Sequence, residues 1–100
     1  MIIYNVTVKV DNDVADAWVE WMKSTHMADL MSTGLFVGCR LCRLLEQDET
    51  EGVTYAAQYF LNDIDQYNKY IELHSGNLRE KGMKLFGGKF AAFRTVMEII

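Results

Sequence analysis

Residues 2–10 alternate between the two faces of a β-strand, and this pattern limits the fold more than any other feature of the chain. The even positions are all apolar: Ile2, Tyr4, Val6, Val8 and Val10. The odd positions mix apolar and polar side chains: Ile3, Asn5, Thr7 and Lys9. Both faces carry apolar residues, so the pattern leaves open which face packs against helices.

A helix is expected after this strand. Asp11, Asn12 and Asp13 offer an N-cap and first-turn carboxylates. Five apolar residues and a threonine then recur at helical spacing: Val14, Ala17, Trp18, Trp21, Met22 and Thr25. We expect the helix to start near residue 13, to break near residues 24–26, and to resume as a short turn through residues 28–31.

The remaining elements complete a recognisable order. Strands are predicted over residues 35–46 and 53–61, and the short polar segment 47–52 joins them as an antiparallel hairpin. Asn62 or Asp63 caps a second helix that Gly76 is expected to break, and residues 90–100 form a last strand. One mainly apolar stripe runs along this second helix: Ile64, Tyr67, Ile71, His74 and Leu78.

The order β-α-β-β-α-β is typical of the ferredoxin-like split βαβ arrangement. We therefore predict one α+β domain over residues 1–100, with a four-stranded antiparallel sheet and both helices on one face. Two helices cover only one face of such a sheet. At about 25 cal/mol per Å² of apolar area, an uncovered apolar face would forfeit several kcal/mol. A homodimer that packs sheet on sheet is the expected solution.

Composition excludes several classes of protein. The chain has no proline and two cysteines, and its net charge is −4 because 14 Asp and Glu outweigh 10 Lys and Arg. No broad basic field is present to hold a nucleic-acid backbone, so nucleic acid is not an expected partner. No apolar run approaches the roughly 18 residues of a membrane-spanning helix, and we expect a cytoplasmic protein with no membrane contact.

The segment Cys39-Arg40-Leu41-Cys42 matches C-x-x-C but falls in a predicted strand. Residues three apart in a strand point to opposite faces, with Cα atoms about 10 Å apart, beyond the reach of a disulfide. No second cysteine pair completes a zinc site, and the histidines lack metal-ligand spacing. We predict structural thiols, no metal site and no resident cofactor.

Several polar and aromatic residues are candidates for a site. His74 lies on the apolar stripe of the second helix, where it is either a core histidine or a proton-transfer group. Asn5 interrupts the best strand and would form a small polar pocket with an inward His74. His26 lies where the first helix frays, and its alternatives are a structural position or a ligand contact. Aromatic residues of the two helices line a pocket or simply form the core: Trp18, Trp21, Tyr67 and Tyr70.

Charged clusters give weaker signals. Four acidic residues crowd the predicted hairpin tip without the pattern of a calcium loop. The stretch before the last strand carries four basic residues: Arg79, Lys81, Lys84 and Lys89. This stretch either forms a solvated face or binds an anion, although it contains no phosphate-binding glycine motif.

The chain resembles the dimeric α/β-barrel superfamily, which includes antibiotic-biosynthesis-type and haem-degrading monooxygenases and stress-responsive barrel domains. The segments that carry the closest resemblance, to a bacterial domain family of unknown function, are YNVTVKVDNDVADAWVEWMKSTHMADLMSTGLF and GGKFAAFRTVMEI. The resemblance spans essentially the whole chain and implies the ferredoxin-like fold and a dimer.

The haem-degrading branch implies an Asn on the first strand, a Trp near the end of the third strand and a His on the second helix. Asn5 and His74 match the first and last, but Phe60 stands nearest to the missing Trp. The leading hypothesis is a small apolar or aromatic ligand between sheet and helices, contacted by Trp18, Trp21, Tyr67, Phe60 and His26. The alternatives are a cofactor-independent or haem-utilising monooxygenase, with His74 and Asn5 as catalytic groups, and a structural or regulatory dimer without a ligand.

Overall fold

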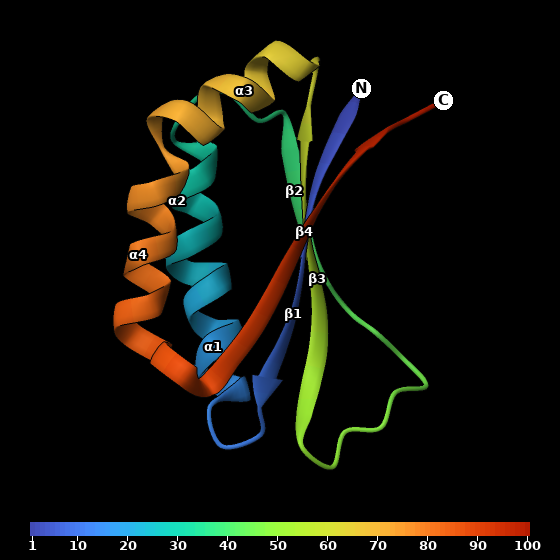
Figure 1. Cartoon of the computed structure of the whole chain (residues 1–100), viewed down its shortest axis with the longest axis vertical. Coiled ribbons are helices and arrows are strands. Elements are labelled where there is room, and N and C mark those ends of the chain that lie inside the picture. The colour runs from blue at the N-terminus through green and yellow to red at the C-terminus, as the bar shows by residue number, and fades with distance from the viewer.

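The computed structural model describes all residues from 1 to 100 as one sheet covered on one side by helices (Figure 1). The strands are β1 (Ile2–Asp11), β2 (Gly38–Arg43), β3 (Gly52–Leu61) and β4 (Phe90–Glu98). The helices are α1 (Ala15–Trp21), α2 (Met27–Met31), α3 (Ile64–Leu73) and α4 (Ser75–Phe86). A π-helical turn (Met22–His26) joins α1 to α2, and a 3-10 turn (Gly87–Lys89) precedes β4.

The sheet has the order β2-β3-β1-β4, with every neighbouring pair antiparallel. β1 lies at its centre, where Tyr4 pairs with Tyr59 of β3 on one side and Val96 of β4 on the other. β1 and β2 run parallel with β3 between them, which is the split βαβ connection. The predicted ferredoxin-like α+β fold is thus confirmed.

The structure settles which face of β1 packs against the helices. Tyr4, Val8 and Val10 are buried under the helical layer, whereas Lys9 is exposed on the opposite face. Tyr55 and Tyr59 of β3 lie on the same inner face as these even-numbered residues because they pair with Val8 and Tyr4. The aromatic core therefore forms on the inner face.

The first helical segment differs from its prediction at two points. It begins at Ala15 with Val14 as the N-cap residue, and no side chain caps it, although Asp11, Asn12 or Asp13 was expected to do so. A break was expected near residues 24–26, but the chain continues through the π-helical turn, in which the backbone N–H of Met27 donates to the carbonyl of Met22 five residues back. Ser24 donates its hydroxyl to the carbonyl of Glu20 within this wider turn. The helical rod therefore stays continuous, but the side chains after the π-helical turn point in directions that differ from those of a regular α-helix.

The second helical segment begins as predicted and bends earlier than predicted. The side chain of Asp63 accepts a hydrogen bond from the backbone N–H of Gln66, so Asp63 is the N-cap. The bend falls at His74, which ends α3 and precedes α4, and Gly76 lies inside α4. The predicted break at Gly76 is therefore wrong by two residues.

The second strand is shorter than the expected 35–46 segment. Phe36 precedes β2 and is buried against two tyrosines, with ring centroids 5.6 Å from Tyr59 and 5.0 Å from Tyr70. The connection from β2 to β3 extends away from the body of the molecule (Figure 1). The apolar character of Phe36 thus reflects core packing in a loop, whereas Val37 is exposed and its backbone N–H donates to the carbonyl of Phe60 in β3.

The outer face of the sheet carries no helix (Figure 1). Its composition is mixed, because the row of Asn5, Gln58 and Thr95 is polar while Ile3 pairs with Phe60 and Met97. Phe93 remains 64% exposed on this face. No helix of the fold is long and apolar enough to span a membrane.

Candidate functional site

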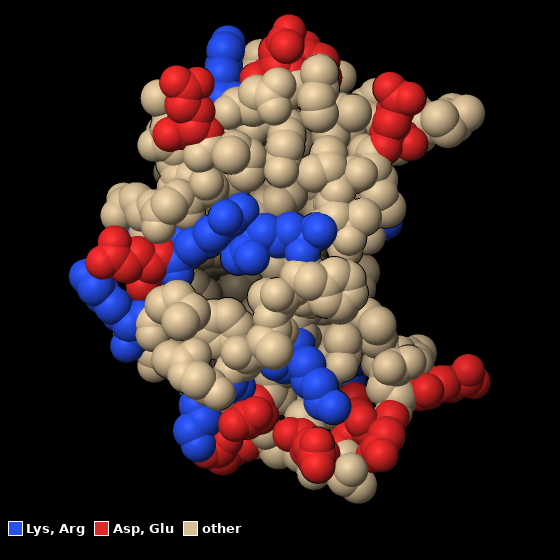
Figure 2. Space-filling view, viewed as in Figure 1, with Lys and Arg blue, Asp and Glu red and all other residues tan.

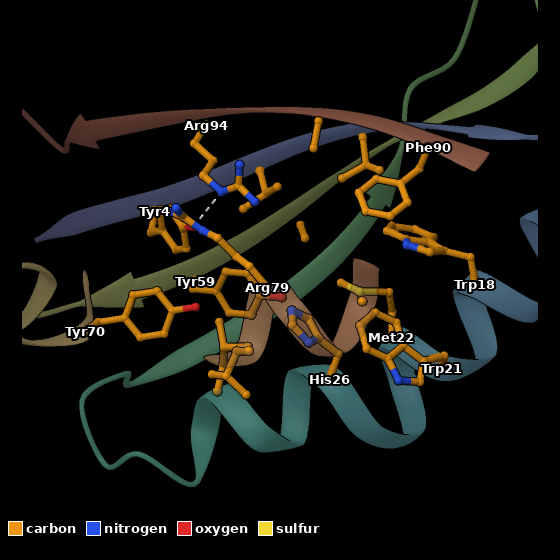
Figure 3. A pocket seen from close by; sticks show the side chains of 17 residues that line it. Tyr4, Trp18, Trp21, Met22, His26, Tyr59, Tyr70, Arg79, Phe90 and Arg94 are labelled. Atoms are coloured by element: carbon orange, nitrogen blue, oxygen red, sulfur yellow. Dashed lines mark hydrogen bonds between the residues drawn. The ribbon is translucent and has the colours of Figure 1, made fainter. Parts of the chain in front are cut away.

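A cavity of about 70 Å³ lies between the inner face of the sheet and the helices (Figure 3). Its lining is mainly apolar and includes six aromatic residues: Tyr4, Trp18, Trp21, Tyr59, Tyr70 and Phe90. Figure 2 shows that a hollow opens on the surface next to Lys and Arg side chains. The cavity is small, because pockets for drug-sized ligands measure about 300–1,000 Å³. It has room for several water molecules or one small organic group.

The π-helical turn decides which side chains of the first helical rod reach the cavity. In an α-helix of about 3.6 residues per turn, residues five apart point in different directions. In the wider turn Trp21 and His26 lie on the same side and stack, with ring centroids 4.6 Å apart and planes inclined by 26°. Both side chains line the cavity, as does Trp18, whose indole packs 5.1 Å from the ring of Tyr55.

His26 is an uncharged imidazole in this environment. Burial lowers the pKa of His26 from 6.5 to about 4, and Asp29 opposes this shift only in part, while Lys81 and Arg94 add to it. The buried Nδ1 atom has no hydrogen-bond partner in the protein. The ring therefore presents an unused polar atom inside an apolar cavity, where a buried group without a partner costs free energy.

Two arginines meet at the other end of the cavity (Figure 3). Arg79 of α4 donates from Nη2 to the hydroxyl oxygen of Tyr4 at 3.3 Å, and Arg94 of β4 donates from Nε to the same oxygen at 3.2 Å. The Nε of Arg79 is buried and has no partner. No aspartate or glutamate lines the cavity, so this end is positively charged.

Two further tyrosines keep their phenol protons. Burial is the main cause that raises the pKa of Tyr59 and that of Tyr70 well above the ordinary value of 10. Both rings therefore act as neutral hydroxyl donors or as apolar walls, and neither supplies a negative charge to the arginines.

The structure brings together three of the predicted ligand contacts: Trp18, Trp21 and His26 all line the cavity. Tyr67 does not line it but packs behind Tyr4, with ring centroids 5.6 Å apart. Phe60 lies on the outer face of the sheet, where the guanidinium of Arg40 stands 5.4 Å from its ring centroid. Phe60 is thus separated from the cavity by the sheet itself.

The predicted pocket formed by Asn5 and His74 is wrong. Asn5 also points to the outer face, where its amide donates to the hydroxyl of Thr7 at 3.1 Å. His74 stands in the helical layer at the junction of α3 and α4 and does not line the cavity. The sheet separates the two side chains, so they form no joint polar site.

Sequence reasoning named Arg79 only as part of a basic stretch that could accept an anion, and it missed Arg94 and Tyr4 as residues of the site. Arg94 follows Phe90 by four positions in one strand, and residues an even number apart share a face. That spacing was a usable signal once the inner face of the last strand was known. Arg79 stood among lysines in a basic stretch, and only its position in α4 turns it toward the cavity.

The residues present do not fit a haem or a metal centre. No group of three His, Cys, Asp or Glu side chains lies together as metal ligands would. His74 does not reach the cavity, and the volume is far below that of sites for large ligands. Cys39 is half-buried and Cys42 is exposed, and both are free thiols.

The chain belongs to the family described as Domain of unknown function (DUF4286), whose model matches residues 1–100. The comparison with curated proteins finds no matching sequence.

Solved structures with the same fold cover the chain almost completely. HapK from Hahella chejuensis is 14% identical with a TM-score of 0.70, and the match covers 100% of this chain and 93% of HapK. A dimeric ferredoxin-like protein from an uncultured marine organism is 11% identical with a TM-score of 0.72, covering 100% of this chain and 95% of its own. A mutant of SnoaB, a cofactor-independent oxygenase from Streptomyces nogalater, is 15% identical with a TM-score of 0.66, covering 98% and 92%. At these identities the similarity establishes the fold.

Proposed function

We propose that this member of the DUF4286 family binds a small apolar or aromatic molecule in the cavity between the sheet and the helices. The observation that carries the proposal is an aromatic cavity that contains buried polar atoms without partners, on His26 and Arg79. Ligand sites combine such apolar walls with a few convergent polar groups. The volume limits the occupant to roughly one ring or a short branched chain.

Filling the cavity tests this proposal. Ala92 lines the cavity from β4, whereas its neighbour Ala91 is exposed and does not line it. We expect Ala92→Leu to abolish binding of phenol and of benzoate, and Ala91→Leu to leave binding unchanged. The measurement is an NMR or tryptophan-fluorescence titration up to about 10 mM, because so small a ligand is expected to bind in the millimolar range. Failure of the unmodified protein to bind any small aromatic compound would remove the proposal and leave a structural dimer without a ligand.

We also propose that two copies pair through the outer faces of their sheets. Phe93 is 64% exposed there, and Ile3, Phe60 and Met97 form an apolar row on the same face. Burying these side chains stabilises an association at about 25 cal/mol per Å² of apolar area. A solved ferredoxin-like neighbour is described as dimeric.

The dimer has a direct test. Phe93→Glu places a charge in the proposed interface, and we expect it to shift the protein from dimer to monomer in sedimentation experiments at micromolar concentration. Leu85→Glu is a matched control, because Leu85 is 60% exposed on α4 in the helical layer. Wild-type protein that sediments as a monomer at this concentration contradicts the pairing.

A second candidate is oxygenation of the bound molecule without a cofactor. The unpartnered Nδ1 of His26 supports it, since an imidazole nitrogen without a protein partner is free to hydrogen-bond a substrate inside the cavity and orient it. The fold shared with SnoaB, itself a cofactor-independent oxygenase, is consistent with this chemistry. The test is oxygen consumption with a phenolic compound that binds, which His26→Phe should abolish while binding persists. The cytoplasmic location stays a prediction from the sequence.

A further inference from the structure

We propose that the bound molecule is an organic acid, whose carboxylate is held by Arg79 and Arg94 at the mouth of the cavity. This inference rests on the proposed function and makes it more specific, because it names the charge and the head group of the ligand.

Two like charges converge at the mouth of the cavity. Arg79 and Arg94 come from different elements, α4 and β4, and both donate to the single hydroxyl oxygen of Tyr4. Two guanidinium groups this close repel each other, and a neutral phenol does not cancel their charge. An anion placed between the two guanidinium groups offsets that repulsion. It also accepts hydrogen bonds from the guanidinium N–H groups that do not donate to Tyr4.

Neither of these two arginines has a carboxylate partner within the protein. The chain carries more acidic than basic residues, and its ion pairs engage Arg43, Lys81, Lys84 and Lys89. Neither Arg79 nor Arg94 takes part in an ion pair, although Arg43 shows a two-point contact with the carboxylate of Glu49. Figure 2 shows blue side chains beside the hollow, with many acidic residues toward the two ends of this face and others at its left edge next to basic side chains. The arginines at the cavity are thus available for an external acid.

The arginines also have N–H donors that no protein group uses. The Nε of Arg79 is buried and unpartnered, and a guanidinium presents its donors in a planar fork that matches the two oxygens of a carboxylate. The imidazole of His26 is neutral because burial lowers its pKa to about 4, so the arginines carry the positive charge of the cavity. The charge lies at one end and the indoles of Trp18 and Trp21 lie at the other.

This polarity describes the ligand. Its head is a planar oxyanion, and its body is an apolar group about the size of one ring that contacts the aromatic walls. Inorganic phosphate satisfies the arginines but leaves the apolar walls without a partner. A neutral aromatic compound contacts the apolar walls but leaves the arginines without an anion. An aromatic or branched carboxylic acid contacts both the arginines and the apolar walls.

The experiment compares benzoate, its neutral isostere benzamide and inorganic phosphate by NMR titration at low ionic strength. We expect benzoate to bind about tenfold or more tightly than benzamide, and to bind less tightly as NaCl is added. Phosphate should bind more weakly than benzoate. Arg79→Gln and Arg94→Gln should each reduce the preference for benzoate, whereas Arg43→Gln removes the same charge from a guanidinium outside the cavity and should not.

The outcomes separate this inference from the proposed function. Equal binding of benzoate and benzamide overturns the carboxylate site while small-molecule binding stands. Binding of neither compound by the folded protein overturns both proposals. If either glutamine variant unfolds, as judged by circular dichroism, Arg79→Lys and Arg94→Lys replace it. Lysine keeps the charge but loses the fork, so an unchanged preference in both lysine variants shows that charge alone selects the acid and overturns the fork geometry.

Discussion

The buried imidazole of His26 should make the stability of the protein depend on pH in a defined range. Its pKa is about 4 in the folded chain, compared with 6.5 for an ordinary histidine, mainly because burial disfavours the charged form. As the pH falls, the unfolded chain takes up this proton before the folded chain does. Stability is therefore fully present above pH 6.5, falls between pH 6.5 and about 4, and changes no further with this group below that range.

The size of the effect follows from the same two values. A pKa lowered from 6.5 to about 4 corresponds to about 3 kcal/mol of unfolding free energy. The ring is not fully buried, so we expect about 2–3 kcal/mol. Small domains have total stabilities of about 5–15 kcal/mol, which makes this loss a large fraction of the total.

Urea unfolding at several pH values between 7.5 and 4 measures the effect, with His26→Gln as the comparison. Glutamine keeps polar atoms at this position but does not titrate, so carboxylate titrations common to both proteins cancel in the difference. One protein concentration must be used throughout, because dimer formation adds its own concentration dependence. Parallel curves for the wild type and His26→Gln would refute the reasoning.

Three further substitutions test the packing. Gly52→Ala should destabilise the fold by about 2 kcal/mol in urea unfolding, because a Cβ atom there would lie 2.7 Å from the carbonyl oxygen of Val10. Gly76→Ala, which meets no atom within 4 Å inside α4, should instead stabilise the protein by about 0.5–1 kcal/mol in the same assay. Trp18→Ala should cost about 3–5 kcal/mol and remove the near-UV circular dichroism of the Trp18 and Tyr55 pair, because the indole is only 3% exposed.

The fold was largely predictable because its elements depend on local patterns. Alternation in residues 2–10 and the cap at Asp63 both concern neighbours in the sequence, and the structure has a strand and a helix start at these positions. The π-helical turn was not predictable in this way, since its side-chain spacing resembles that of a frayed helix. The start of the second strand was predicted too early because Phe36 is apolar. A buried loop residue and a buried strand residue have the same apolar character.

The site was harder to predict because it depends on which face of each strand is inward. Asn5 was paired with an inward His74 because a polar residue in a buried strand needs a partner, yet Lys9 on the same face as Asn5 indicates that this face is directed away from the helices. The pairing of Arg79 with Arg94 joins α4 to β4 through Tyr4 on a third element, β1. Contacts of this kind are set by tertiary packing, and no spacing within the sequence encodes them.

The π-helical turn also bears on how the cavity changes between relatives. Such a turn is equivalent to one residue added to an α-helix. A relative lacking one residue between positions 22 and 26 would return to regular helix, and every later side chain of the rod would rotate by about 100°. The imidazole would leave the cavity although its codon was unchanged, so insertions and deletions here alter the chemistry of the cavity as effectively as substitutions do.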